Sequence, residues 1–335
     1  MRVLVIIAAV AHAAISPNET RSLLDGALDG IAAKLRYHGR AFMLAEPFPH
    51  VVIDGLFPAA VVEALAAEIP ERFDCSHSWT TGGQTCFSRG GHEMRKVQIS
   101  DISAMGPHTR AYTEFVRSAP FRRALEALTG FAEGALVNDN NNEGAGTHVT
   151  LPGGYLKVHA DFNGDFGGGL ARRVNTFLYL NPDWDDSYQG HLQLWARNMS
   201  TCTREISPTL NRFVVFKTDD FSYHGHPVPL LAPEGRARRS IAAYFYTKGY
   251  RDARECLHPM CHAGDWRRCT CKWHNTLWHD SPCLACTHHI MRKQFGNGAC
   301  GVRMRMRRLK SLGPSSHQGA MHQSLARFHS EHVGN

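Results

Sequence analysis

Short runs of apolar or alternating residues fill the middle of the chain and predict β-strands. Residues 190–195 alternate between apolar and polar positions with a period of two, which is typical of a half-buried strand. The runs at 172–181, 212–216 and 240–246 are mostly apolar, and Asn, Gly, Pro and Asp residues lie between them. Short strands separated by such turns predict an all-β sandwich, jelly roll or barrel.

Helical segments precede this region. Residues 15–45 are predicted as a helical lead-in, and residues 59–69 as a further helix that follows the extended segment 47–54. The predicted fold class is therefore mainly β with flanking helices (α+β). With 335 residues and 43% hydrophobic content, the chain can bury one full core and carry an appendage.

A His-x-Asp pair, His159 and Asp161, ends the extended run 153–159. Both side chains point to one side, because alternate residues of a strand share a face. About 60 residues later, His224 or His226 offers a second imidazole. Two imidazoles and one carboxylate on one face of a metal form the facial triad of non-haem Fe(II) oxygenases. A lone His-x-Asp is more often a solvated turn pair, so the surrounding sequence decides.

The stretch from about Pro47 to Thr247 resembles the 2-oxoglutarate/Fe(II) dioxygenases of the prolyl 4-hydroxylase type. The segments that carry the resemblance, in the family's order and spacing, are residues 153–163, 179–181, 190–192 and 224–240. The resemblance implies a double-stranded β-helix (jelly-roll) core in a dioxygenase domain that spans residues 46–248.

The resemblance also implies the metal ligands, which would be His159, Asp161 and one later histidine. His224, which is followed by the small residue Gly225, fits the family's third ligand. His226 would then contact the substrate or support the ligands. Because His224 and His226 share a strand face, the residue pattern by itself leaves both open.

An arginine is the expected anchor for the cosubstrate, since a guanidinium fork suits a carboxylate. The resemblance assigns this role to Arg238 with Ser240, which fall on one face of the predicted strand. Arg239 falls on the other face and is expected to be a solvated or outer-face charge. Tyr179 is implied to donate its hydroxyl to the same carboxylate, and Tyr155 is a further expected cosubstrate contact.

The activity that the resemblance implies is hydroxylation with Fe(II), 2-oxoglutarate and O2, releasing succinate and CO2, with ascorbate as a reductant. The expected substrate is a peptidyl proline, and the alternative is a free amino acid or small molecule. Residues 75–92 and 138–147 are expected to form the loops that select it. No nucleic-acid partner is expected. An alternative of another class is a non-catalytic protein that binds partners through its basic tail.

The N-terminus predicts a secretory signal peptide over residues 1–14. Residues 3–10 form an apolar run after Arg2, and residues 11–13 have the small-x-small pattern of a cleavage site. The alternative is an apolar first strand or helix of a cytosolic protein. Sequons at Asn18 and Asn198 are compatible with the secretory pathway, either a luminal location or secretion. No later segment is long and apolar enough to predict a membrane span.

The last part of the chain has a different composition. From residue 248 onward there are 14 Lys and Arg against 5 Asp and Glu, whereas the rest of the chain has 23 against 25. Seven of the ten cysteines also lie there. Residues 249–335 are therefore predicted to form a Cys/His-rich basic tail that is partly disordered. Disulfides, a structural zinc site, or no stable structure remain open for this tail.

Overall fold

The computed structural model describes residues 15–76, 78–87, 93–162, 164 and 169–249. The expected signal peptide and nearly all of the expected tail, residues 250–335, lie outside the described residues. None of the described helices is long and apolar enough to cross a membrane.

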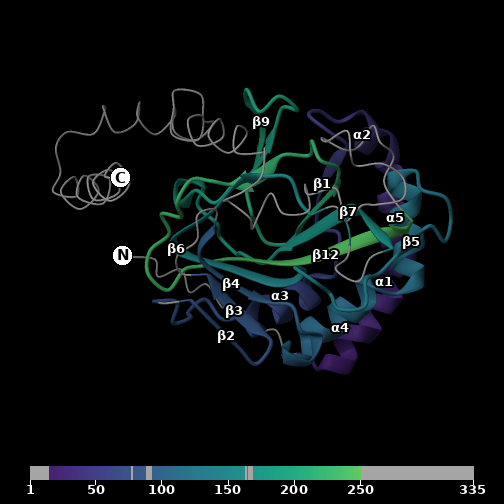
Figure 1. Cartoon of the computed structure of the whole chain (residues 1–335). Coiled ribbons are helices and arrows are strands. Elements are labelled where there is room, and N and C mark those ends of the chain that lie inside the picture. Colours follow the sequence, from purple (N-terminus) through teal and green to yellow (C-terminus); the bar gives the residue numbers. More distant parts are fainter. Residues whose placement is uncertain (1–14, 77, 88–92, 163, 165–168, 250–335) are drawn as a thin grey trace, which may run out of the picture.

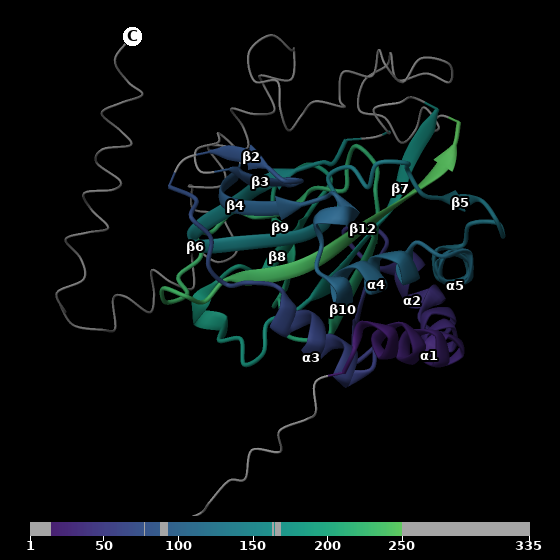
Figure 2. The ribbon, with the colours of Figure 1, turned by 90° about the horizontal axis from the view of Figure 1, so that it is seen from below.

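The α-helices of the described residues gather on one side of the molecule (Figures 1 and 2). They are α1 (Pro17–Tyr37), α2 (Gly39–Leu44), α3 (Ala59–Glu68), α4 (Pro107–Val116) and α5 (Ala119–Thr129). Helix α1 begins with a capping box, in which Ser16 and Glu19 satisfy each other's backbone N–H groups. The Glu68 carboxylate joins α3 to α4, because it accepts bonds from the backbone N–H groups of His108 and Thr109, at 2.8 and 2.7 Å.

The strands form one curled sheet in which all pairings between strands are antiparallel. They are β1 (His50–Asp54), β2 (Trp79–Thr81), β3 (Gln84–Phe87), β4 (Glu93–Ile99), β5 (Leu136–Val137), β6 (Gly146–His159), β7 (Leu170–Tyr179), β8 (Leu192–Trp195), β9 (Cys202–Ile206), β10 (Arg212–Lys217), β11 (His224–His226) and β12 (Arg238–Lys248). The main order is β1-β10-β7-β12-β6-β11-β8-β9, with β4, β3 and β2 added on β6. Short 3-10 helices occur at Ile102–Ala104 and Asp186–Tyr188.

Strand β6 is long and pairs with different strands along its length. Its first half pairs with β12, and its second half pairs with β11, while β4 runs alongside both halves. Residues 152–154 lie at the junction between the halves, where a Cβ on Gly154 would come within 2.7 Å of the Met94 carbonyl oxygen. Glycine is therefore required at this close approach. The His159 end of β6 therefore lies beside β11, whereas its first half lies beside β12.

The two faces of the sheet are covered differently. The outer face, which includes Val97, Val149 and Leu178, packs against the helices in the largest core cluster. The inner face carries a smaller apolar cluster that includes Tyr179 and Phe216. Polar and charged residues share this inner face with them. The expectation of a mainly β fold with flanking helices and a jelly-roll core is confirmed.

One expected loop region contains regular structure. Residues 79–87 form the β2–β3 hairpin, and β4 continues the sheet from Glu93, where we expected a substrate-selecting loop over 75–92. A disulfide between Cys75 and Cys86 joins this hairpin to the segment before it, with the two Cα atoms 5.9 Å apart. The hairpin strands are short and carry several polar residues, so they lack the apolar pattern that would have predicted them.

Candidate metal and cosubstrate site

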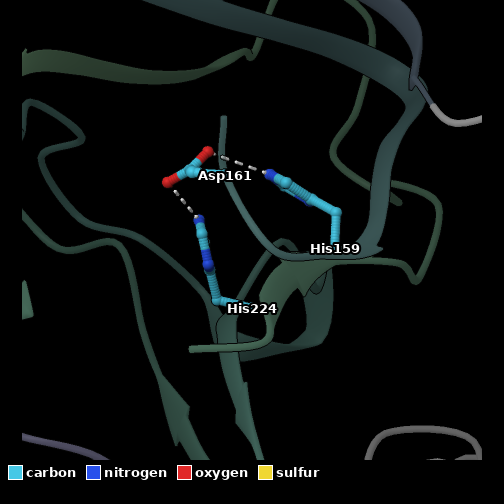
Figure 3. A group of neighbouring side chains, drawn as sticks. All are labelled: His159, Asp161 and His224. Carbon is cyan, nitrogen blue, oxygen red and sulfur yellow. Dashed lines mark ion pairs between the residues drawn. The ribbon is translucent and has the colours of Figure 1, made fainter. Parts of the chain in front are cut away.

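His159, Asp161 and His224 meet at the end of strand β6. Each offers one ligand atom, and the three atoms lie within 4.8 Å of one another. The Asp161 carboxylate lies between the two rings, with one oxygen 3.5 Å from Nε2 of His159 and the other 3.5 Å from Nε2 of His224 (Figure 3). His159 and His224 are directly opposite each other in the β6–β11 pairing. The sheet register therefore assembles the group from two distant parts of the chain.

Gly225 makes this strand pairing possible. A Cβ at this position would lie 2.7 Å from the Lys157 carbonyl oxygen and 2.9 Å from that of Leu156. Strand β11 could not approach β6 so closely with any larger residue. The small residue beside His224 is thus needed for backbone packing.

Backbone carbonyl groups fix the tautomer of both histidines. Nδ1 of His159 lies 2.7 Å from the Lys157 carbonyl oxygen, and Nδ1 of His224 lies 2.9 Å from that of Ser222. Because a carbonyl can only accept, each Nδ1 must carry the proton. Each Nε2 then presents a lone pair toward Asp161. Two such nitrogens and a carboxylate oxygen fit Fe(II), and the carbonyl contacts are the kind that orients ligating histidines.

Asp161 is held by two residues of β7. Arg172 donates to one carboxylate oxygen at 3.1 Å, and Asn175 donates to the same oxygen through its side-chain amide. Arg172 is 0% exposed and stacks on the Tyr244 ring, with 3.4 Å from its guanidinium carbon to the ring centre. Burial by itself would raise the pKa of Asp161, but Arg172 and then His224 hold that pKa well below its usual range. The carboxylate is therefore ionised, as a metal ligand must be.

Burial also keeps His224 neutral. It lowers the pKa of His224 to about 4, although Asp161 acts in the opposite direction. A neutral imidazole is the form that binds metal. His226 is buried too, but it is not a member of the group, because a β-bulge separates it from His224 and places it opposite Leu156. The geometry thus brings His224 and not His226 to His159 and Asp161.

Arg238 and Tyr179 lie deeper on the inner face of the sheet. Arg238 donates to the Gly190 carbonyl oxygen at 2.6 Å and to the Tyr179 hydroxyl at 3.0 Å. Ser240 is directly opposite Tyr179, and its hydroxyl has no hydrogen-bond partner within the described residues. A cation and two hydroxyls, one of which is buried and unpaired, together suit a carboxylate ligand.

Arg239 faces the helices, as the strand parity predicts, but it is not solvated. It is 4% exposed, donates to the carbonyl oxygens of Ala66 and Ile69, and pairs with Glu71 at 2.9 Å. The expectation of a solvated charge is wrong, because the last carbonyl groups of α3 need donors and this arginine supplies them.

Tyr155 lies half-buried on β6, opposite Met94 and four residues before His159. A β-bulge between Leu156 and His159 interrupts the strand alternation, so the expected cosubstrate role of Tyr155 stays a prediction. Burial raises the pKa of its hydroxyl. No hydrogen bond fixes that hydroxyl among the described residues.

Sequence reasoning missed three polar residues of the interior: Arg172, Asn175 and Lys96. Asn175 could have been found, because it stands four residues before Tyr179 and alternation puts both on one face. Arg172 does not follow this alternation, because a bulge interrupts the pairing of β7 with β12 between Arg172 and Val174. Sequence spacing does not reveal such a bulge. Lys96 lies on a strand that the hydrophobic pattern did not predict.

Residues 145–246 match the model of the 2OG-Fe(II) oxygenase superfamily. The matched segment contains every residue of the site described above except Lys96. Among curated proteins, none matches the chain.

Several solved structures are similar to the chain at low identity. A prolyl-4-hydroxylase from Pseudomonas putida is 19% identical, covers 66% of this chain and all of its own, and has a TM-score of 0.38. A prolyl hydroxylase from Trichoplax adhaerens, solved with a hypoxia inducible factor peptide fragment, is 15% identical over 69% of this chain and 91% of its own, with a TM-score of 0.36. HygX from Streptomyces hygroscopicus, solved with nickel, 2-oxoglutarate and hygromycin B, is 13% identical. The match covers 68% of this chain and 95% of HygX, with a TM-score of 0.40.

Proposed function

We propose that this chain, whose residues 145–246 match the model of the 2OG-Fe(II) oxygenase superfamily, is a member of that superfamily and hydroxylates a peptidyl proline. In the overall reaction, 2-oxoglutarate, O2 and a C–H bond of the substrate give succinate, CO2 and the hydroxylated product. One oxygen atom enters succinate and the other enters the substrate. The observation that carries the proposal is the convergence of His159, Asp161 and His224 beside a buried Arg238–Tyr179 pair.

Each group of residues has a part in this reaction. His159, Asp161 and His224 would hold Fe(II), and Arg172 would keep Asp161 ionised and in place. Arg238, with Tyr179, Ser240 and Tyr155, would orient 2-oxoglutarate. The bound metal would supply the redox chemistry that couples decarboxylation of 2-oxoglutarate to hydroxylation, with ascorbate as a reductant that restores Fe(II).

The proline substrate rests on the sequence resemblance described above. The alternative is the same chemistry on a free amino acid or another small molecule. Both are tested by measuring succinate release from 2-oxoglutarate with Fe(II) over a panel of proline-rich peptides and free amino acids. Peptide-dependent release that the His159→Ala variant lacks would support the proposal. Release that only small molecules stimulate would replace the substrate class.

The proposal extends to a location in the secretory pathway. The Cys75–Cys86 disulfide supports it, since disulfides persist in oxidising compartments. Asn198 is exposed, whereas Thr20 of the other sequon is fully buried. Expression of the full chain in a eukaryotic host should therefore give a product whose mobility shifts on N-glycosidase treatment, and Ser200→Ala should abolish that shift. An unmodified cytosolic product would contradict this location.

A further inference from the structure

Lys96 is a buried cation on the inner face of the sheet. It lies on β4 directly opposite Thr150 of β6, and Arg238 of β12 lies opposite the same Thr150 from the other side. Residues that pair in register share a sheet face, so Lys96 and Arg238 flank Thr150 within the barrel. Lys96 is only 7% exposed. Its neighbour in sequence, Val97, packs in the outer core, as alternation requires.

The two cations act on the same interior. Burial, followed by Lys96 and Arg238, holds the pKa of His148 well below its ordinary value. His148 pairs with Ser240 and stands two residues before Thr150, so it shares the inner face with both cations. Lys96 and Arg238 thus line one space.

That space has polar atoms that need a ligand. The Ser240 hydroxyl and Nδ1 of His226 are buried with no hydrogen-bond partner among the residues that the structure describes. The Lys96 ammonium donates to Glu93 at 2.8 Å, which accounts for one of its three N–H groups. Among the described residues named here, Arg238 and Lys96 carry two positive charges and Glu93 carries one negative charge. One further carboxylate would balance these three charges.

We propose that Lys96 is a second cationic contact for the distal carboxylate of 2-oxoglutarate, acting with Arg238. This inference rests on the proposed function and deepens it. Arg238 presents a fork that fixes the carboxylate plane, while Lys96 presents a compact charge that Glu93 positions. Lys96 would therefore help the site to select a 2-oxo diacid over a 2-oxo acid without the second carboxylate.

The test compares two ligands that differ in that carboxylate. Binding of 2-oxoglutarate and of 2-oxopentanoate is measured by calorimetry on the Mn(II)-loaded full chain without O2. For Lys96→Met, we expect 2-oxoglutarate to bind roughly 10- to 100-fold more weakly, the scale of one charge-assisted hydrogen bond. Binding of 2-oxopentanoate should change less than about threefold on that scale. Lys96→Arg should recover part of the loss.

Two controls keep the outcome clear. Lys34→Met removes a lysine of α1 that bonds the Gly55 carbonyl oxygen outside the barrel, and it should leave both affinities unchanged. The Glu93→Gln/Lys96→Met double variant avoids a buried unpaired carboxylate, so it can replace Lys96→Met if that variant does not fold. It should show the same selective loss of 2-oxoglutarate binding, with 2-oxopentanoate binding little changed.

Unchanged 2-oxoglutarate binding in a folded Lys96→Met variant would overturn the inference, as would an equal loss for both ligands. A raised KM for the primary substrate with unchanged 2-oxoglutarate binding would also overturn it, because Lys96 would then face the substrate. If the Mn(II)-loaded wild type binds neither ligand, the proposed function itself fails.

Discussion

Asp161 and His159 differ in the contacts that each makes besides those within the metal group. Asp161 neutralises the buried Arg172, whereas His159 bonds only a backbone carbonyl through its second nitrogen. Both Asp161→Ala and His159→Ala should abolish Mn(II) or Fe(II) binding in a calorimetric titration. Asp161→Ala should in addition lower the free energy of unfolding by about 3–5 kcal/mol, because it leaves a buried charge unpaired. Chemical denaturation of the metal-free proteins measures this difference, and equal stability of the two variants would contradict the role of Arg172.

The two histidines of β11 should behave differently when each is replaced. His224→Ala removes a member of the metal group and should eliminate metal binding and 2-oxoglutarate turnover. His226→Ala removes a ring outside that group, so metal affinity should remain close to that of the wild type. Side-by-side metal titrations of the two variants check this. The opposite ranking would move the third ligand to His226.

Arg238 should control the cosubstrate. Arg238→Ala removes the fork that would hold a buried carboxylate, a loss of about 2–5 kcal/mol. At about 1.4 kcal/mol per tenfold, 2-oxoglutarate should bind tens to thousands of times more weakly. Metal binding should persist, because Arg238 does not contact the metal group. Titration of 2-oxoglutarate into the Mn(II)-loaded variant decides the point, and wild-type affinity would refute it.

At the scale of elements, Arg239 links strand β12 to helix α3. Its guanidinium group donates to two carbonyl oxygens near the end of the helix and pairs with Glu71. Arg239→Met should lower the free energy of unfolding by about 1–3 kcal/mol, since the buried carbonyl oxygens lose their donors. The affinity for 2-oxoglutarate of the folded fraction should stay unchanged. A variant with normal stability but weak cosubstrate binding would show that the face assignment of β12 is mistaken.

The sequence predicts some elements far better than others. The apolar runs of β7, β10 and β12 are recognisable from residue type, and their alternation places Arg238 and Arg239 on opposite faces correctly. The expected extended run begins at Gly153, yet β6 already begins at Gly146 and continues through residues 152–154. The Leu230 carbonyl oxygen accepts from the Gly153 N–H group, and the Leu230 N–H group donates to the Gly154 carbonyl oxygen; such long-range contacts leave no mark in the local sequence. The polar hairpin β2–β3 is missed for the reason given above.

At the scale of the whole molecule, the last strand of the sheet ends where the basic tail begins. Strand β12 ends at Lys248, and Gly249 bonds the Gly169 carbonyl oxygen at 2.9 Å. We therefore expect a protein of residues 15–249 to fold alone and to retain 2-oxoglutarate decarboxylation with a small peptide. Thermal unfolding and succinate release test this expectation. Its net charge should also lose the basic excess that begins at residue 248.

A soluble, metal-loaded but inactive protein of residues 15–249 would contradict the division into a domain and a tail.

The metal group itself could be anticipated from sequence, because His159 and Asp161 are two residues apart and His224 precedes a required glycine. The support of Asp161 by Arg172 could not, since it depends on how β7 meets the end of β6. Local spacing identifies ligands, and only the assembled sheet identifies what holds them.

The neighbouring residues Arg238 and Arg239 serve opposite sides of the same strand, and this restricts how the gene can vary. A one-residue insertion or deletion within β12 would turn each side chain to the other face. It would send one guanidinium group from the barrel to α3 and the other from α3 into the barrel. Point substitutions at other positions of the strand would leave this arrangement intact. An insertion or deletion within the strand would displace Arg239 from helix α3 and Arg238 from the cosubstrate site at the same time. Insertions and deletions should therefore be tolerated outside β12 and not within it.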